Sequence, residues 1–436
     1  MPTKVSAFYC FLRFYTLCYN FARISKYVEI TAIDERKTAR HNTLQHTVKK
    51  CQARRLILAA LLILAFVFSV FAIWSVDYVD ENGIVHNGLT APRKLTDAKS
   101  EYKGVLTTDV IQDVLRKDKS VKSEYGGSVP NTVYAENEQK YSDIKDMAVS
   151  ILCYDKDFDY ASVDSLTLSE AGRIYNVRDD NIDRIIKEYG DTEVKKNYIK
   201  EQYSKVSVPF EYAPAVSWQT MGLYATTYAM ILLIVNSFLA AGIFSEEFRL
   251  QADTVFFSTK LGRRKGTLSK IAAGLIMVTV VYWGAMLILS VISFGVMGIS
   301  GAESPIQIEY SYCMYAYSFM QAYMTILLAG YIGNILAAVT AMLVSAKSHS
   351  AILAMCVPFL LFIVSPFIGR VLPFKEFFNI TPDQLVNVYN CIRLQLVYQF
   401  GETAVMQIPM LIVLYSCVAV ILIPCTYRIF SRYSVR

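Results

Sequence analysis

Six apolar runs of membrane-crossing length constrain the fold of this chain more than any other feature. The first, residues 56–76 (LILAALLILAFVFSVFAIWSV), contains no charged side chain, and five more follow in the second half of the chain, at 224–244, 271–294, 316–344, 350–368 and 408–423. About 20 consecutive apolar residues cross the hydrocarbon core of a bilayer, and a soluble protein rarely contains six such runs. The pattern predicts an all-α membrane protein with six transmembrane helices.

The placement of charges predicts the orientation of these helices. Residues 1–55 carry 11 Lys and Arg against 3 Asp and Glu, whereas residues 77–217 carry 19 against 26. Basic residues concentrate in cytoplasmic segments of membrane proteins. The first apolar run also lies too far from the N-terminus to be a signal peptide. We therefore expect both termini to be cytoplasmic and residues 77–217 to be extracellular.

The 77–217 segment is long enough to fold as a domain. Its signals for helix starts and ends predict a mainly helical domain with some strand, and an α+β fold is the alternative. Ser169 is expected to cap one helix and Asp179 or Asp180 the next, which would end at Gly190.

Two other features of the outer segments leave alternatives open. Asp155, Asp157 and Asp159 alternate as in a calcium loop, but the turn glycine and the bidentate Glu are missing, which favours a solvated acidic turn. Cys153 and Cys391 are the external cysteines; a disulfide between them is an alternative to two free thiols, which we favour.

Two further segments carry apolar residues outside the runs. The cytoplasmic segment 1–55 mixes aromatic and basic residues, which is typical of an interfacial helix on the inner leaflet, and a disordered leader is the alternative. Residues 370–407 repeat apolar side chains at helical spacing, which predicts a re-entrant or surface helix over the outer mouth of the bundle.

The connection between the second and third runs, residues 245–270, is unusually rich in charges and aromatics (SEEFRLQADTVFFSTKLGRRKGTLSK). It predicts a short helix that exposes Phe256 and Phe257. Exposed aromatic side chains on a charged cytoplasmic connection need the membrane surface or a partner protein to cover them.

This connection resembles the one between spans two and three of ABC-2 permeases, the membrane subunits of a class of ABC transporters. That family shows acidic residues, a short helix, a basic pair and a Lys that enters the next span; the positions that carry the likeness are Glu246, Glu247, Asp253, Ser258, Thr259, Arg263, Arg264 and Lys270. Lys260 stands where a Pro is common in the family. The likeness covers about residues 220–430, and a large external domain after the first span is similar to the sodium- and peptide-exporter branches.

The resemblance implies a function and its partners. The connection would be the coupling helix, which docks on a separate ATPase subunit through Glu246, Glu247, Asp253, Phe256, Phe257, Arg263 and Arg264. The chain lacks a phosphate-binding G-x-x-x-x-G-K-[ST] motif, so we expect a non-catalytic subunit that binds no cofactor, with ATP used by the partner. A second permease chain and membrane lipids are the other expected partners, nucleic acid is not expected, and the expected location is a bacterial cell membrane.

Polar residues within the runs are few. Asn236, Gln321 and Asn334 are candidates for a translocation path, and helix–helix hydrogen bonds are the alternative. The lack of charged residues inside the runs favours an amphipathic, peptide or antibiotic-like substrate over a bare ion. Two other classes remain: a mechanotransmission subunit, which moves its external domain without passing cargo, and an intramembrane enzyme, for which facing catalytic groups are absent from the runs.

Overall fold

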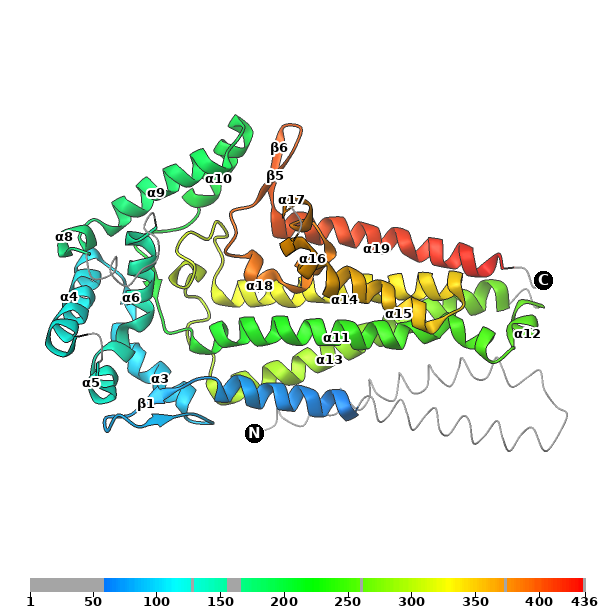
Figure 1. The fold of residues 1–436 in the computed structure, drawn as a ribbon, viewed down its shortest axis with the longest axis horizontal. Helices are drawn as coiled ribbons and strands as arrows, with labels where there is room; N and C mark the ends of the chain where they lie inside the picture. Colours follow the sequence, from blue (N-terminus) through cyan, green and yellow to red (C-terminus); the bar gives the residue numbers. More distant parts are fainter. Residues whose placement is uncertain (1–58, 127–128, 155–165, 259–261, 372–374, 434–436) are drawn as a thin grey trace, which may run out of the picture.

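The computed structural model describes residues 59–126, 129–154, 166–258, 262–371 and 375–433. Within these ranges the chain is predominantly helical. Figure 1 shows two parts: a bundle of long helices, and a domain of shorter helices at one end of it. The expected interfacial helix of 1–55 and the Asp155, Asp157 and Asp159 turn lie outside the described residues.

Five helical segments in the described residues are long and apolar enough to cross a membrane. These are α11 (Val216–Arg249), Gly262–Met297, α14 (Phe319–Ser348), Ala351–Gly369 and α19 (Gln407–Ser431). The segment Gly262–Met297 joins a π-helical turn, η2 (Gly262–Gly266), to α13 (Thr267–Met297). A shorter apolar helix, Ala59–Trp74, covers most of the first predicted run.

Several of these helices are longer than the apolar runs that predicted them. α11 has 34 residues, α13 has 31 and α14 has 30. At 1.5 Å of rise per residue they measure about 45 to 51 Å, which exceeds the ~30 Å hydrocarbon core of a bilayer. The ends of these three helices therefore extend past the hydrocarbon core.

The fifth long segment is interrupted. α15 (Ala351–Phe359) contains Pro358 and passes into a π-helical turn, η4 (Leu360–Val364), before α16 (Ser365–Val371). A proline removes a backbone hydrogen bond, and π turns are frequent where a helix kinks. This segment is therefore jointed, unlike α11 and α14.

The small domain confirms the expectation of helices with a little strand. Its helices are α3 (Ala91–Lys99), η1 (Ser100–Tyr102), α4 (Thr108–Tyr125), α5 (Asn131–Glu136), α6 (Glu138–Leu152), α8 (Leu168–Ala171), α9 (Ile174–Tyr189) and α10 (Glu193–Ser204). Two antiparallel pairs complete it: β1 (Tyr78–Val79) with β2 (Val85–His86), and β3 (Gly104–Val105) with β4 (Glu211–Tyr212).

The expected N-caps of this domain were wrong by a few residues. Thr167, not Ser169, caps α8 in a reciprocal pair with Glu170. α9 runs without interruption from Ile174 to Tyr189, so Asp179 and Asp180 lie inside the helix, which does end at Gly190. Cys153 and Cys391 are both buried, and no disulfide joins them, as favoured above.

The connection after α16 differs from the single helix expected there. It contains α17 (Lys375–Phe378), η5 (Pro382–Val386), α18 (Val388–Cys391) and a hairpin of β5 (Val397–Phe400) and β6 (Thr403–Met406). η5 folds back against the middle of α14, where Leu385 and Val386 pack on Gly333. Figure 1 shows the hairpin projecting sideways from the bundle.

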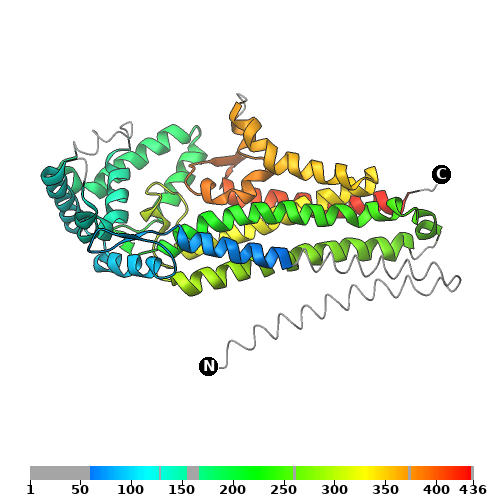
Figure 2. The same ribbon diagram turned by 60° about the horizontal axis from the view of Figure 1, so that its bottom comes forward.

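One continuous apolar core joins the domain to the nearer half of the bundle. It includes Ile111 and Ile144 of the domain and Tyr228 and Leu232 of α11. The helix Ala59–Trp74 lies beside α11 (Figure 2), where the hydroxyl of Tyr228 donates to the carbonyl of Leu61 at 3.2 Å. A separate core, described next, lies at the opposite end of the bundle.

Candidate functional site: the connection between α11 and α13

The predicted connection 245–270 is mostly helix rather than loop. α11 continues to Arg249, and helix resumes at Gly262. Between them lies α12 (Asp253–Ser258), which follows a tight reversal at Gln251, where φ is +54°. The true connection is therefore short, and Figure 1 shows α12 at the end of the bundle farthest from the domain.

Phe257 is buried, contrary to the expectation of an exposed side chain. It is 1% exposed, and its ring centroid lies 5.0 Å from that of Phe430 and 5.1 Å from that of Tyr433, both at the end of α19. Phe256 is half-buried, with its ring 5.6 Å from Phe430. The aromatic residues of α12 thus belong to a core of this chain.

The same aromatic cluster reaches α11 and α14. Phe248 stacks on His349, with ring centroids 3.7 Å apart. His349 ends α14 in the left-handed conformation, with φ +58°. Burial lowers the pKa of His349, with Asp253 opposing the shift, which favours the neutral imidazole that stacks on a phenyl ring. Four helices therefore meet at this cluster.

The acidic and basic residues of the connection also bind one another. Glu247 pairs with Lys270, which in addition donates to the carbonyl of Ile243 at 3.1 Å. Glu246 pairs with Arg249 at 3.2 Å. Arg263 Nε donates to the carbonyl of Phe257 at 2.7 Å and so ties α12 to the start of the α13 segment. The Arg263 bond and the aromatic contacts of Phe257 hold α12 in a defined position.

The outer face of α12 is exposed. Val255 is 65% exposed, and Thr254 and Ser258 are exposed beside it. Leu250, Arg264 and Lys265 are exposed on the flanking segments. An apolar centre with basic neighbours is an arrangement suited to a protein partner.

Two of the predicted path residues bind each other. Asn236 Nδ2 on α11 donates to Asn334 Oδ1 on α14 at 2.9 Å, and both side chains are fully buried. Asn334 Nδ2 donates to the carbonyls of Ala229 and Gly330. This geometry matches the helix–helix hydrogen bond that was the alternative. Gln321 is exposed at the start of α14, where it closes a capping box with Ser318.

A double-mutant cycle tests the asparagine pair. We expect Asn236→Ala and Asn334→Ala to show a coupling free energy of about 1 kcal/mol, the usual size for hydrogen bonds between membrane helices. Unfolding of the purified protein by a denaturing detergent would measure it. Additive effects of the two changes would show that the bond contributes nothing to stability.

Sequence reasoning did not single out the carboxyl groups of Asp383 and Glu309, because both lie outside the apolar runs. Asp383 on η5 is 1% exposed and accepts from Ser365 Oγ at 2.9 Å. Glu309 lies in the connection before α14, which contains η3 (Ile306–Ile308). No signal in the sequence separates these two residues from exposed acids.

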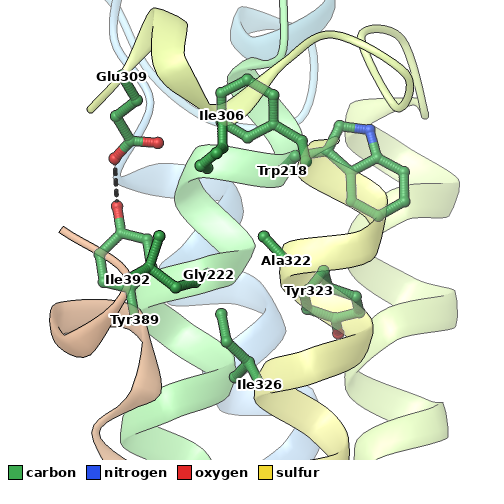
Figure 3. Close-up of a pocket in the computed structure, with 10 residues that line it drawn as sticks. Trp218, Gly222, Ile306, Glu309, Ala322, Tyr323, Ile326, Tyr389 and Ile392 are labelled. Carbon is green, nitrogen blue, oxygen red and sulfur yellow. Dashed lines mark hydrogen bonds between the residues drawn. The ribbon is translucent and has the colours of Figure 1, made fainter. Parts of the chain in front are cut away.

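Glu309 borders a narrow pocket between the domain end of the bundle and the connections that cover it. Figure 3 shows Glu309 facing Tyr389, with Trp218, Tyr323 and Ile306 around the same space. Tyr389 Oη donates to Glu309 Oε1 at 2.6 Å. The other oxygen, Oε2, is buried without a hydrogen-bond partner among the described residues.

This environment predicts a pH-dependent stability. Burial raises the pKa of Glu309, Asp143 adds to the shift, and the hydroxyls of Tyr389 and Tyr310 oppose it. The folded protein therefore binds this proton more tightly than the unfolded chain does. The contribution of Glu309 is most favourable at low pH and declines as pH rises from the unfolded pKa, about 4.3, to the folded one.

We expect Glu309→Gln to remove this decline, because glutamine still accepts from Tyr389 and carries no charge. At pH values above the folded pKa of Glu309, the variant should melt at a higher temperature than the parent protein. Melting curves from pH 4 to 8 would measure the effect, with Glu303→Gln, at an exposed carboxyl of the same connection, as control. Parallel profiles for parent and Glu309→Gln would contradict the prediction.

The described residues contain no group of His, Cys, Asp and Glu that could hold a metal ion. No protein-family model matches this chain, and the comparisons with curated proteins and with solved structures find no match either. The residues themselves, above all those of α12 and its surroundings, must therefore indicate the function.

Proposed function

We propose that this chain is the membrane permease subunit of an ATP-driven transporter of the ABC-2 type, and that α12 is its contact with a separate ATPase chain. The observation that supports this most directly is the two-sided character of α12. Its inner face is anchored in the aromatic cluster, whereas Val255 on its outer face is exposed. A helix held in this way would transmit a push from a partner to α11, α14 and α19.

The distribution of charge supports a cytoplasmic position for α12. Basic residues gather at this end of the bundle, at the ends of α11, α14 and α19 and the start of α13. They are Arg249, Arg263, Arg264, Lys265, Lys270, Lys347, Arg428 and Arg432. By the positive-inside rule this end faces the cytoplasm of a bacterial cell, and the small domain lies outside.

In this proposal Ala59–Trp74 is the first of six spans, and two permease chains pair with two ATPases. We propose export of an amphipathic or peptide-like substrate. ATP is used by the partner, so the chain itself is not an enzyme and holds no cofactor.

A second candidate is a mechanotransmission subunit, which moves its outer domain without passing cargo. The Asn236–Asn334 bond favours it, since two polar residues expected on a path are occupied in holding helices together. The continuous core between the domain and the bundle favours it as well. ATP-dependent efflux of a peptide library from cells or vesicles would separate the two candidates.

Val255→Asp tests the proposed docking surface. An apolar anchor at the centre of an interface contributes about 2 kcal/mol or more, and that loss corresponds to about a thirtyfold weaker complex. We expect recovery of the ATPase with the tagged permease to fall accordingly, as measured by mass spectrometry of the purified complex. Expression and melting temperature should be unchanged, because the side chain lies on the surface.

The matched control is Ile84→Asp, an exposed apolar residue of the small domain. It should leave ATPase recovery unchanged. Undiminished recovery with Val255→Asp would reject α12 as the docking helix, whatever else the chain does.

A further inference from the structure

An open groove lies where the small domain meets the end of α13. It encloses about 760 Å³, part of it open to solvent, between the start of α3 and the last turn of α13. Its lining residues are Leu89, Thr90, Arg93, Lys94, Asp97, Gly295 and Val296. None of them belongs to the α12 site, which lies at the opposite end of the bundle.

The length of α13 places this groove at the level of lipid headgroups. Lys270 marks the charged end of the helix, and Gly295 follows 25 residues later, about 38 Å along the axis. The hydrocarbon core is about 30 Å thick, and the headgroup layers extend the bilayer to about 40 to 45 Å. A span that begins at Lys270 therefore brings Gly295 and Val296 into the opposite headgroup layer.

The residues around the groove have the character of a membrane interface. Leu89 and Ile299 are more than 60% exposed. Trp74, which is also exposed, lies against Gly88, the residue before Leu89. Tryptophan is enriched where hydrocarbon meets the headgroups. Apolar surface continues along α13 through the exposed Leu287 and Val291, which gives acyl chains a place to lie.

Two basic side chains line the groove at this level. Arg93 donates to the carbonyls of Val296 and Gly295 at 2.6 and 2.7 Å, which fixes α3 on the end of α13. The exposed Lys94 has no carboxylate partner within ion-pair distance among the described residues; its ammonium lies 5.7 Å from the ring of Tyr78. Asp97, one turn further along α3, adds a negative charge to the same groove.

From this combination we infer that the groove binds the headgroup of an anionic phospholipid, with Lys94 and Arg93 facing the phosphate and the acyl chains lying against α13. The charge complementarity and the continuous apolar surface favour a lipid over a protein segment. The inference depends on α13 crossing a membrane and not on an ATPase partner.

Lipid retention tests the inference. The purified chain would be placed in nanodiscs of phosphatidylglycerol and phosphatidylcholine, and the bound lipids counted by native mass spectrometry. One basic residue near a membrane surface contributes about a fivefold preference for an anionic lipid. We expect Lys94→Glu to lower phosphatidylglycerol retention by about that factor or more, and Asp97→Asn to raise it. Lys200→Glu, an exposed lysine on α10 at the far side of the domain (Figure 1), should change nothing.

Three results would overturn the inference. Equal phosphatidylglycerol retention by the parent, Lys94→Glu and Asp97→Asn would show that the groove does not bind the headgroup. Displacement of the lipid by glycerol phosphate at equal concentration would show a site for a free anion. A covalent dimer formed efficiently by Lys94→Cys would show that a second copy of the chain covers the groove.

Discussion

Phe257→Ala is expected to lower the free energy of unfolding by about 3 to 5 kcal/mol, the usual cost of emptying a buried aromatic site. Phe257 is almost fully buried and contacts rings from α11 and α19. The surrounding side chains cannot collapse into the space without moving the ends of two long helices. The purified variant should melt at a clearly lower temperature, and less protein should reach the membrane.

Phe257→Asp should be more damaging still, because it also places an unpaired carboxylate among aromatic rings. Val255→Asp is the matched control, since it makes the same side chain two residues earlier on the exposed face of α12. If Phe257→Ala melted like the parent, the aromatic cluster would not be the element that holds α12 in place.

Gly330→Leu should have a comparably large effect. A Cβ at Gly330 would lie 2.6 Å from Tyr282 Oη on α13 and 3.1 Å from Ala229 Cβ on α11. The Tyr282 hydroxyl donates to the carbonyl of Leu327 at 2.8 Å, so it cannot move without losing that bond. Small residues allow close approach of membrane helices. A leucine must separate α14 from both neighbours, which we expect to cost more than the ~1 to 3 kcal/mol typical of overpacking.

Gly242→Leu on α11 provides the comparison. A Cβ there meets nothing within 4 Å, and replacing a glycine inside a helix removes a cost of about 1 kcal/mol. We expect this variant to be as stable as the parent or more so. Detergent-unfolding midpoints for the two leucine variants would measure the difference, and equal midpoints would reject the close approach of α11, α13 and α14.

The long helices could be predicted from the sequence, but their ends could not. Hydropathy marks the residues that lipid can cover, and α11 continues for several residues beyond Tyr224 and Phe244 in both directions. Those extra turns are stabilised by the small domain at one end and by the Glu247–Lys270 pair at the other. Contacts of this kind join distant parts of the chain, so an apolar run does not report them.

The exposure of Phe257 was predicted wrongly for the same reason. Phe257 stands among charged residues in the sequence, as an exposed binding residue would. The rings that bury it, those of Phe430 and Tyr433, lie more than 170 residues later in the chain. The division of the predicted residues into an inner and an outer face of α12 required the fold.

The hairpin of β5 and β6 could have been found. β-branched and aromatic residues flank the two-residue turn Gly401–Glu402, and Gly401 has φ +63°, a conformation that glycine adopts readily. The helical periodicity of the preceding residues obscured this signal. Asp383 is different, because only the return of η5 into the bundle makes it a buried carboxyl.

The lengths and interruptions of the helices divide the bundle mechanically. α11 and α14 contain no proline and no π turn within their bounds, whereas α15 contains Pro358 and leads into η4, and α19 contains Pro424. α11 and α14 also join the aromatic cluster at one end to the shared apolar core at the other. α11 and α14 would move as rigid units, and the interrupted helices beside them would bend. A molecule that binds the distant domain would then change the affinity of α12 for a partner. The partner would change the affinity of the domain for that molecule by the same factor, because coupling between two sites is reciprocal.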